Sequence, residues 1–126
     1  MVIDNLNERL IDSGKHLLEE LDKSNIKIDA ALWFYFLDIE SWKLLLSFPN
    51  IGNAGPKAVY QVVQKMLLKI KSEIPLDDIA VSKPKDPLLK LLKIAIKTGP
   101  GTSGIRFTNN VINGQLIKDA YIYRLV

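Results

Sequence analysis

The stretch AALWFYFLDIESWKLLLSFP, residues 30–49, decides the fold of this chain. Two runs of aromatic and aliphatic residues flank one short polar break at residues 38–41. Such runs on either side of a short loop are typical of two antiparallel strands joined as a β-hairpin. A loop of two or four residues places Leu37 opposite Trp42, and continuing the pairing places Phe34 opposite Leu45. Because side chains alternate between the two faces of a strand, both faces of the first strand are apolar.

The last segment, GIRFTNNVINGQLIKDAYIYRLV (residues 104–126), predicts a second hairpin. Its adjacent Asn113 and Gly114 are a strong turn signal, because a type I′ turn needs a positive φ at both central residues. Counting outward from this turn gives the cross-strand pairs on both faces. These pairs are Ile105 with Ile122 and Phe107 with Ala120 on one face, and Arg106 with Tyr121 and Thr108 with Asp119 on the other.

The remaining elements follow from apolar spacing. Residues 4–23, 56–71 and 87–97 show the three- and four-residue recurrence of amphipathic helices, and residues 78–82 leave room for one short strand. The element order is therefore α-β-β-α-β-α-β-β. This order predicts a single α+β domain over residues 1–126, with three helices and a mainly antiparallel sheet of about five strands. Gly14 interrupts the apolar stripe of the first helix, and a close approach to a neighbouring strand would explain it.

The composition excludes several kinds of chemistry. The chain has no cysteine, which excludes disulfides, thiol nucleophiles and cysteine-ligated metals. His16 is the only histidine, and the carboxylates lack the spacing of a calcium loop, so we expect no metal and no cofactor, and no residue is assigned a catalytic role. The first residues do not resemble an export signal, and no apolar run is long enough to cross a membrane. We therefore expect a cytoplasmic protein without membrane contact.

The glycine-rich stretch KTGPGTSG, residues 97–104, has the composition of a phosphate-binding loop but the opposite polarity. Phosphate loops follow a strand and open a helix, so that free N–H groups and the positive end of the helix dipole meet the anion. Here a predicted helix runs into the loop and a predicted strand follows it. We expect the loop to end the helix, with Gly99 in the left-handed conformation and Pro100 preventing its continuation.

A polar cluster on the second hairpin is a candidate site for a polar ligand or for acid–base chemistry. The predicted pairing places Asp119 beside Thr108 and close to Arg106 and Tyr121. The same residues fit the solvated outer face of an edge hairpin, held by a cross-strand ion pair. The sequence leaves both interpretations open and favours the second.

Lysines are the candidates for nucleic-acid contact, since the second half of the chain is basic and the first half acidic. Lys90, Lys93 and Lys97 share one face of the third predicted helix, and Lys65 and Lys69 on the second helix would extend that surface. No arginine lies on these helices, and no interleaved aromatic residue suggests base stacking. Binding would therefore rest on phosphate contacts alone, and a solvated helix face is favoured.

The aromatic strand suggests how the protein acts. If all three helices cover one face of the sheet, Leu32, Phe34, Phe36 and Leu45 form an apolar patch on the other, of a kind that monomers seldom expose. Either another chain covers this patch or a helix of the same chain does. We expect a small interaction protein of adaptor type that forms a homodimer or binds a protein partner through this aromatic face. Nucleic-acid binding through the lysines, and an enzyme or small-ligand protein using the polar cluster, are the alternatives.

Overall fold

The computed structural model describes residues 5–50, 55–96, 98–102 and 104–126, and its elements follow the predicted order in one small α+β domain. The helices are α1 (Glu8–Lys23), α2 (Gly55–Lys69) and α3 (Pro87–Ala95), and a short 3-10 helix, η2 (Leu76–Asp78), precedes the third strand. The strands are β1 (Ala30–Phe36), β2 (Ser41–Ser47), β3 (Ile79–Ser82), β4 (Ile105–Ile112) and β5 (Gln115–Leu125). The predicted fold class is confirmed.

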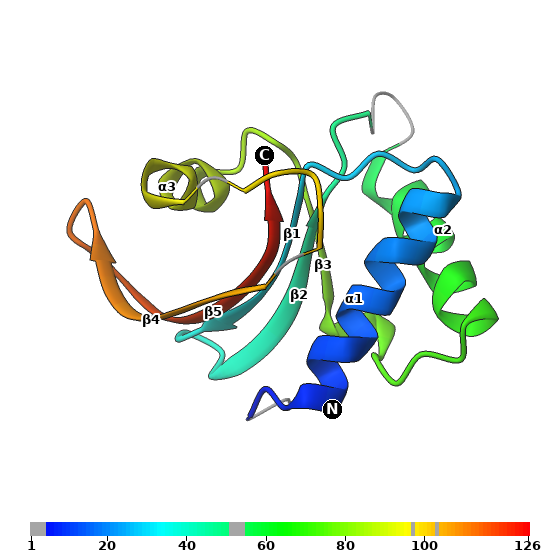
Figure 1. The fold of residues 1–126 in the computed structure, drawn as a ribbon, viewed down its shortest axis with the longest axis horizontal. Helices are drawn as coiled ribbons and strands as arrows, with labels where there is room; N and C mark the ends of the chain where they lie inside the picture. The colour runs from blue at the N-terminus through cyan, green and yellow to red at the C-terminus, as the bar shows by residue number, and fades with distance from the viewer. Residues whose placement is uncertain (1–4, 51–54, 97, 103) are drawn as a thin grey trace.

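The strands form one mixed sheet in the order β3-β2-β1-β5-β4. Neighbouring strands are antiparallel except for β2 and β3, which run parallel because α2 lies in the connection between them. The sheet is strongly curved, with α1 and α2 on its convex side and α3 inside its concave side (Figure 1). Helices therefore cover both faces of the sheet.

Alternation along β1 divides the apolar core into two halves. Trp33 points to the convex side, into a cluster that includes Leu17 of α1 and Val63 of α2. Its sequence neighbour Leu32 points to the concave side, into a cluster that includes Leu89 of α3. Burying a large apolar side chain contributes roughly 1.5–3 kcal/mol, so both faces of β1 hold the sheet to its helices.

The apolar patch expected to remain open is covered by α3, so this part of the prediction is wrong. Leu32, Phe34 and Leu45 are 0%, 7% and 4% exposed and pack in the same cluster as the buried leucines of α3. Phe36, at the end of β1, is half-buried against the same cluster. Because the helices divide between the two faces, these residues belong to the core of the chain and are not available as an interface.

The two hairpins differ in how well their register was predicted. Every predicted pair of the second hairpin is present, and Asn113 and Gly114 have φ values of 48° and 78°. In the first hairpin Phe34 pairs with Lys43 rather than with Leu45, a shift of the pairing by two residues. The turn occupies residues 37–40, which takes Leu37 out of the strand. An even shift leaves every side chain on its predicted face.

The helix before the glycine-rich loop ends earlier than predicted and without a left-handed glycine. Ile96 is extended, with φ −134° and ψ 131°, and its side chain returns to the core at 9% exposed. Gly99 does not have a positive φ, so the cap expected there is wrong. Thr98 instead donates its backbone N–H to Leu125 O at 3.0 Å, which carries the loop across the end of β5. Lys97, which was predicted to end the helix, lies outside the described residues.

Candidate functional site

Arg106, Thr108 and Asp119 meet on the outer face of the β4–β5 hairpin, as the pairing predicted. Arg106 Nε and Nη2 donate to Asp119 Oδ1 and Oδ2 at 2.7 and 2.6 Å, and Thr108 Oγ1 donates to Oδ1 at 3.1 Å. Two parallel N–H···O bonds give such a pair a defined geometry. The guanidinium also lies over the ring of Trp42, 5.5 Å from its centroid. The cluster is thus joined to the first hairpin.

Arg106 and Asp119 of this cluster line a cleft with a volume of about 320 Å³. Tyr35 and Trp42 of the first hairpin line the cleft, together with Asn5 and Leu6 before α1. Aromatic side chains beside a few charged groups are typical of sites that bind small molecules. The polar cluster is therefore part of a concave surface rather than a flat one.

Tyr121, the fourth predicted member of the cluster, does not line this cleft. Its ring packs edge-on against Tyr123, with the ring centroids 5.2 Å apart. Its hydroxyl lies so close to Gly104 that a side chain there would overlap it. Tyr121 therefore packs the start of the hairpin, and glycine at 104 makes that packing possible.

The electrostatics of the cluster suit binding rather than acid–base catalysis. Burial alone would raise the pKa of Asp119, but hydrogen bonds from Arg106 and Thr108, with the charge of Arg106, hold this pKa below its ordinary value. The hydrogen bond to Asp119 in turn raises the pKa of Arg106. The carboxylate stays ionised at neutral pH with both oxygens occupied, so it is not a free general base.

The edge of the sheet at β3 is closed by a side chain of α2. Tyr60 Oη donates to Ile79 O at 3.4 Å and accepts from Val81 N–H at 3.0 Å. These two backbone groups belong to β3 and are paired by the phenol hydroxyl instead of by another strand. Natural proteins cover exposed sheet edges in such ways because unpaired edges recruit other strands.

The edge at β4 has no such cover. β4 is the last strand of the sheet, and no other strand of the described residues pairs with its outer side. Within β4, Asn110 Nδ2 donates to Thr108 O at 2.9 Å. Its sequence, IRFTNNVI, contains neither lysine nor proline, the residues that commonly protect an edge, and Ile105 and Val111 are 40% and 66% exposed. Asn109 has a φ of 49°, which interrupts the regular strand near its middle. β4 therefore presents an open and partly apolar edge, made of two short regular stretches on either side of Asn109.

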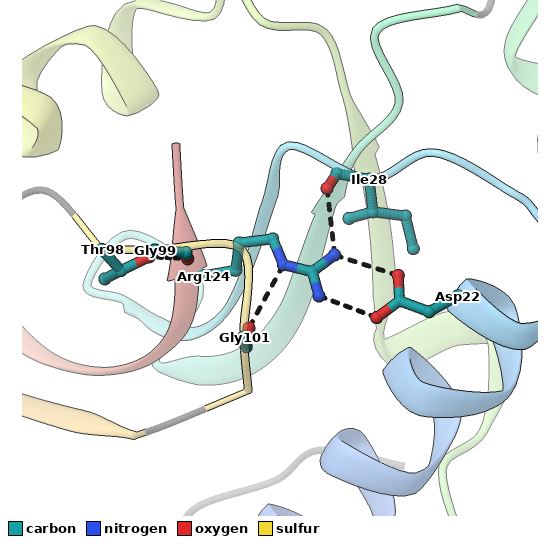
Figure 2. Close-up of polar contacts among 6 residues, drawn as sticks. All are labelled: Asp22, Ile28, Thr98, Gly99, Gly101 and Arg124. Atoms are coloured by element: carbon teal, nitrogen blue, oxygen red, sulfur yellow. Dashed lines mark hydrogen bonds and ion pairs between the residues drawn. The ribbon is translucent and has the colours of Figure 1, made fainter.

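Arg124 of β5 was not singled out from the sequence, yet it joins four segments of the chain (Figure 2). Its side chain is 6% exposed, and Nη1 and Nη2 donate to the two carboxylate oxygens of Asp22 at 3.0 and 2.7 Å. Nη1 also donates to Ile28 O at 3.1 Å, and Nε donates to Gly101 O at 3.2 Å. These bonds use four of the five N–H donors of Arg124, so the side chain stabilises the fold. An arginine inside an apolar strand was the sequence signal for it. Arg124 and Asp22 also line a pocket of about 390 Å³.

The candidate lysines do not form one continuous surface. Lys65 and Lys69 lie on α2, on the convex side of the sheet, whereas Lys90 and Lys93 lie on α3, on the concave side (Figure 1). Lys97 lies outside the described residues. The extended lysine surface considered from the sequence is therefore not formed, because the two helices cover opposite faces.

In the described part of the chain, no metal-ligand cluster and no membrane-spanning helix points to a function. Within residues 5–50, 55–96, 98–102 and 104–126, no three His, Asp or Glu side chains come together as a possible metal site. No helix in that part of the chain is long and apolar enough to cross a membrane. No protein-family model, curated protein or solved structure matches the chain.

Proposed function

We propose that this chain is an interaction protein that self-associates through the open edge of β4. The observation that supports this is the contrast between the two edges of the sheet. Tyr60 pairs two backbone groups of β3, whereas no other element of the described residues pairs with the outer side of β4. An open edge presents unpaired N–H and C=O groups that another strand can satisfy. Two copies of β4 running antiparallel would satisfy one another and join two sheets into one around a two-fold axis.

The side chains of β4 are compatible with a second copy as the partner. Arg106 is the only charged residue of β4, and Asp119 of the same hairpin balances its charge, so pairing two copies opposes no uncompensated like charges. Ile105 and Val111 lie near opposite ends of the strand. Antiparallel pairing of identical strands brings the start of one copy toward the end of the other, where both residues would lose exposed apolar surface. The proposed contact thus lies at the sheet edge, not on the aromatic face.

Proline substitution in the hairpin tests this proposal with a matched control. Val111 and Leu116 are cross-strand partners, one pair away from the two-residue turn. At that position antiparallel geometry turns both N–H groups outward, toward opposite sides of the hairpin. Val111→Pro therefore removes a donor at the open edge, and Leu116→Pro removes one on the other side of the same hairpin.

The measurement is mass by light scattering across a range of protein concentrations, with circular dichroism to confirm folding. We expect dimers for the wild-type chain and for Leu116→Pro, and monomers for Val111→Pro. A wild-type chain that stays monomeric at about 1 mM, where a contact worth about 4 kcal/mol populates the dimer, would refute the proposal. Equal dimerisation of both proline variants would refute the edge as its location.

The cleft beside Arg106 is a second candidate, as a site for a small polar ligand. It is supported by the cleft itself, in which Tyr35 and Trp42 lie beside the Arg106–Asp119 pair. Binding would shift the indole N–H signal of Trp42 in an NMR spectrum, and a Trp42→Phe variant identifies that signal. If a broad panel of amino acids, nucleotides and sugars leaves the signal unmoved, this candidate is discarded.

A further inference from the structure

Ile94 of α3 is a large apolar side chain left exposed although the inner face of this helix is already buried. Leu89 and Leu92 point into the core and are fully buried, whereas Ile94 is 62% exposed and Leu88 and Leu91 are half-buried. A groove of about 310 Å³ lies between these residues and Gln115, beside the turn of the β4–β5 hairpin. An exposed apolar side chain at the edge of a groove is a candidate contact for a partner.

Both charged residues of α3 itself are lysines. Lys90 lines the groove, Lys93 is on the same helix, and Lys83 and Lys85 precede it. The sequence between residues 82 and 116 contains a single acid, Asp86. Its carboxylate caps α3 by accepting from Leu88 N–H at 2.8 Å and also accepts from Ser82 Oγ at 2.6 Å. The lysines are therefore not neutralised by acids of their own segment.

We propose that the groove along α3 binds an amphipathic helix of another protein, one with large apolar side chains and acidic flanks. The apolar face of that helix packs against Leu91 and Ile94, and its carboxylates face Lys90 and Lys93. Two other partners fit less well. A nucleic-acid backbone would complement the lysines but would place Ile94 against phosphates. A lipid surface is flat and would not fill the groove. This surface is separate from the β4 edge, and the inference does not rest on self-association.

The probes are two labelled synthetic peptides of equal length, each with leucine along one helical face. One carries glutamate on its other faces and the second carries lysine there. Fluorescence anisotropy is expected to show the glutamate peptide binding at least ~10-fold more tightly than the lysine peptide, with an affinity that falls as salt screens the charges. The Val111→Pro chain is expected to bind as the wild type does.

Matched substitutions locate the site. Ile94→Asp should weaken binding of the glutamate peptide at least ~10-fold, because Ile94 is the central apolar contact. Lys90→Glu should weaken it by about 3–10-fold, because Lys90 supplies a charge at the edge of the contact. The controls lie on α2, on the other side of the sheet: Leu68→Asp, at a leucine that is 73% exposed, and Lys65→Glu. Both should change affinity less than ~2-fold, as expected outside an interface.

Three results would overturn the inference. The first is equal affinity for the two peptides, and the second is equal loss in the α2 and α3 variants. The third is a chain that binds neither peptide but binds phosphatidylserine vesicles or duplex DNA in a way that depends on Ile94. That result would assign the groove to a membrane or to a nucleic acid.

Discussion

Gly14 of α1 lies directly against the hydroxyl of Tyr123 in β5. A Cβ built at Gly14 would overlap Tyr123 Oη and come within 2.9 Å of Trp33 Nε1. Tyr123 Oη accepts from Trp33 Nε1 at 3.1 Å and donates to Ile11 O at 2.5 Å. Burial raises the pKa of this phenol, which stays protonated and able to donate. The glycine therefore allows the helix to approach closely enough for a buried phenol and a buried indole to be paired.

Gly14→Ala should destabilise the protein, although the same change in an exposed helix stabilises it by about 1 kcal/mol. The added methyl group forces α1 or Tyr123 to move, and overpacking of this kind costs about 1–3 kcal/mol. Urea unfolding followed by circular dichroism measures the free energy of unfolding. Adding Tyr123→Phe should recover part of the loss, because it removes the overlapping oxygen. An alanine variant as stable as the wild type would show that the approach is not tight.

The close approach at Gly14 was predictable, as was every pair of the second hairpin, because each has a local signal. A glycine inside an apolar stripe marks contact, and the sequence Asn113-Gly114 specifies both a turn and its register. The first hairpin lacks such a turn. Its alternating side chains determine only which face each residue occupies, so the predicted faces were right and the pairing was off by two residues.

The covering of the sheet was not predictable in the same way. The apolar stripe of α3 has the same spacing whichever face it covers, so Leu32 and Phe34 could be placed on an apolar face but not beneath a particular helix. Arg106 and Asp119 were found because they are neighbours across one hairpin. Arg124 and Asp22 are 102 residues apart in the chain, and only the assembled fold brings them together.

Removing the hydroxyl that closes the β3 edge should weaken that edge selectively. Tyr60→Phe leaves Val81 N–H and Ile79 C=O without their partner, and losing such a hydrogen bond costs about 1–2 kcal/mol. Hydrogen exchange at the Val81 amide should become faster. Tyr35→Phe is the control, since the Tyr35 hydroxyl makes no hydrogen bond to the described residues. Equal Val81 exchange in both variants would show that the phenol does not protect the edge.

The ion pair of the hairpin should make a small contribution to stability that disappears in acid. Because the pKa of Asp119 is lowered in the folded chain, the stabilisation is present above the ordinary value of 3.8 and is lost as pH falls through the folded pKa. Arg106 is nearly half exposed, so the contribution should stay below about 1 kcal/mol. In Arg106→Gln, burial remains while the cation is gone, and an NMR titration should show a higher pKa for Asp119. An unchanged pKa would contradict this account.

Lys43 should contribute more to stability than a partly exposed lysine usually does, because it lies beside a buried carboxylate. Its Nζ donates to Asp77 O at 2.6 Å and lies 3.6 Å from Asp78 Oδ1, whose side chain is 1% exposed. Neither oxygen of Asp78 accepts a hydrogen bond from the described residues, so Lys43 is the nearby charge that compensates it. Lys43→Met should cost about 3 kcal/mol because it leaves a buried carboxylate unpaired. Adding Asp78→Asn removes that charge and should recover part of the loss; no recovery would indicate that Lys43 acts only through Asp77 O.

The pair formed by Arg124 and Asp22 should show the opposite asymmetry, because here the cation is the buried member. The side chain of Arg124 is 6% exposed and that of Asp22 is 38% exposed. Asp22→Ala leaves a buried guanidinium without its counter-charge and should cost about 3 kcal/mol. Arg124→Met leaves a carboxylate that water can reach and two carbonyl oxygens without their donor, and should cost less, about 1–2 kcal/mol.

Urea unfolding of the two single variants and of the double variant separates the two costs. The double variant should be close in stability to Arg124→Met, since removing Asp22 matters only while the buried cation is present. Hydrogen exchange within residues 98–102 should increase in both chains that lack Arg124, because Gly101 O loses its donor. If Asp22→Ala is less destabilising than Arg124→Met, the charge of Asp22 is not what stabilises the buried guanidinium. The hydrogen bonds from Arg124 to Ile28 O and Gly101 O then contribute more to stability than bonds to neutral acceptors usually do.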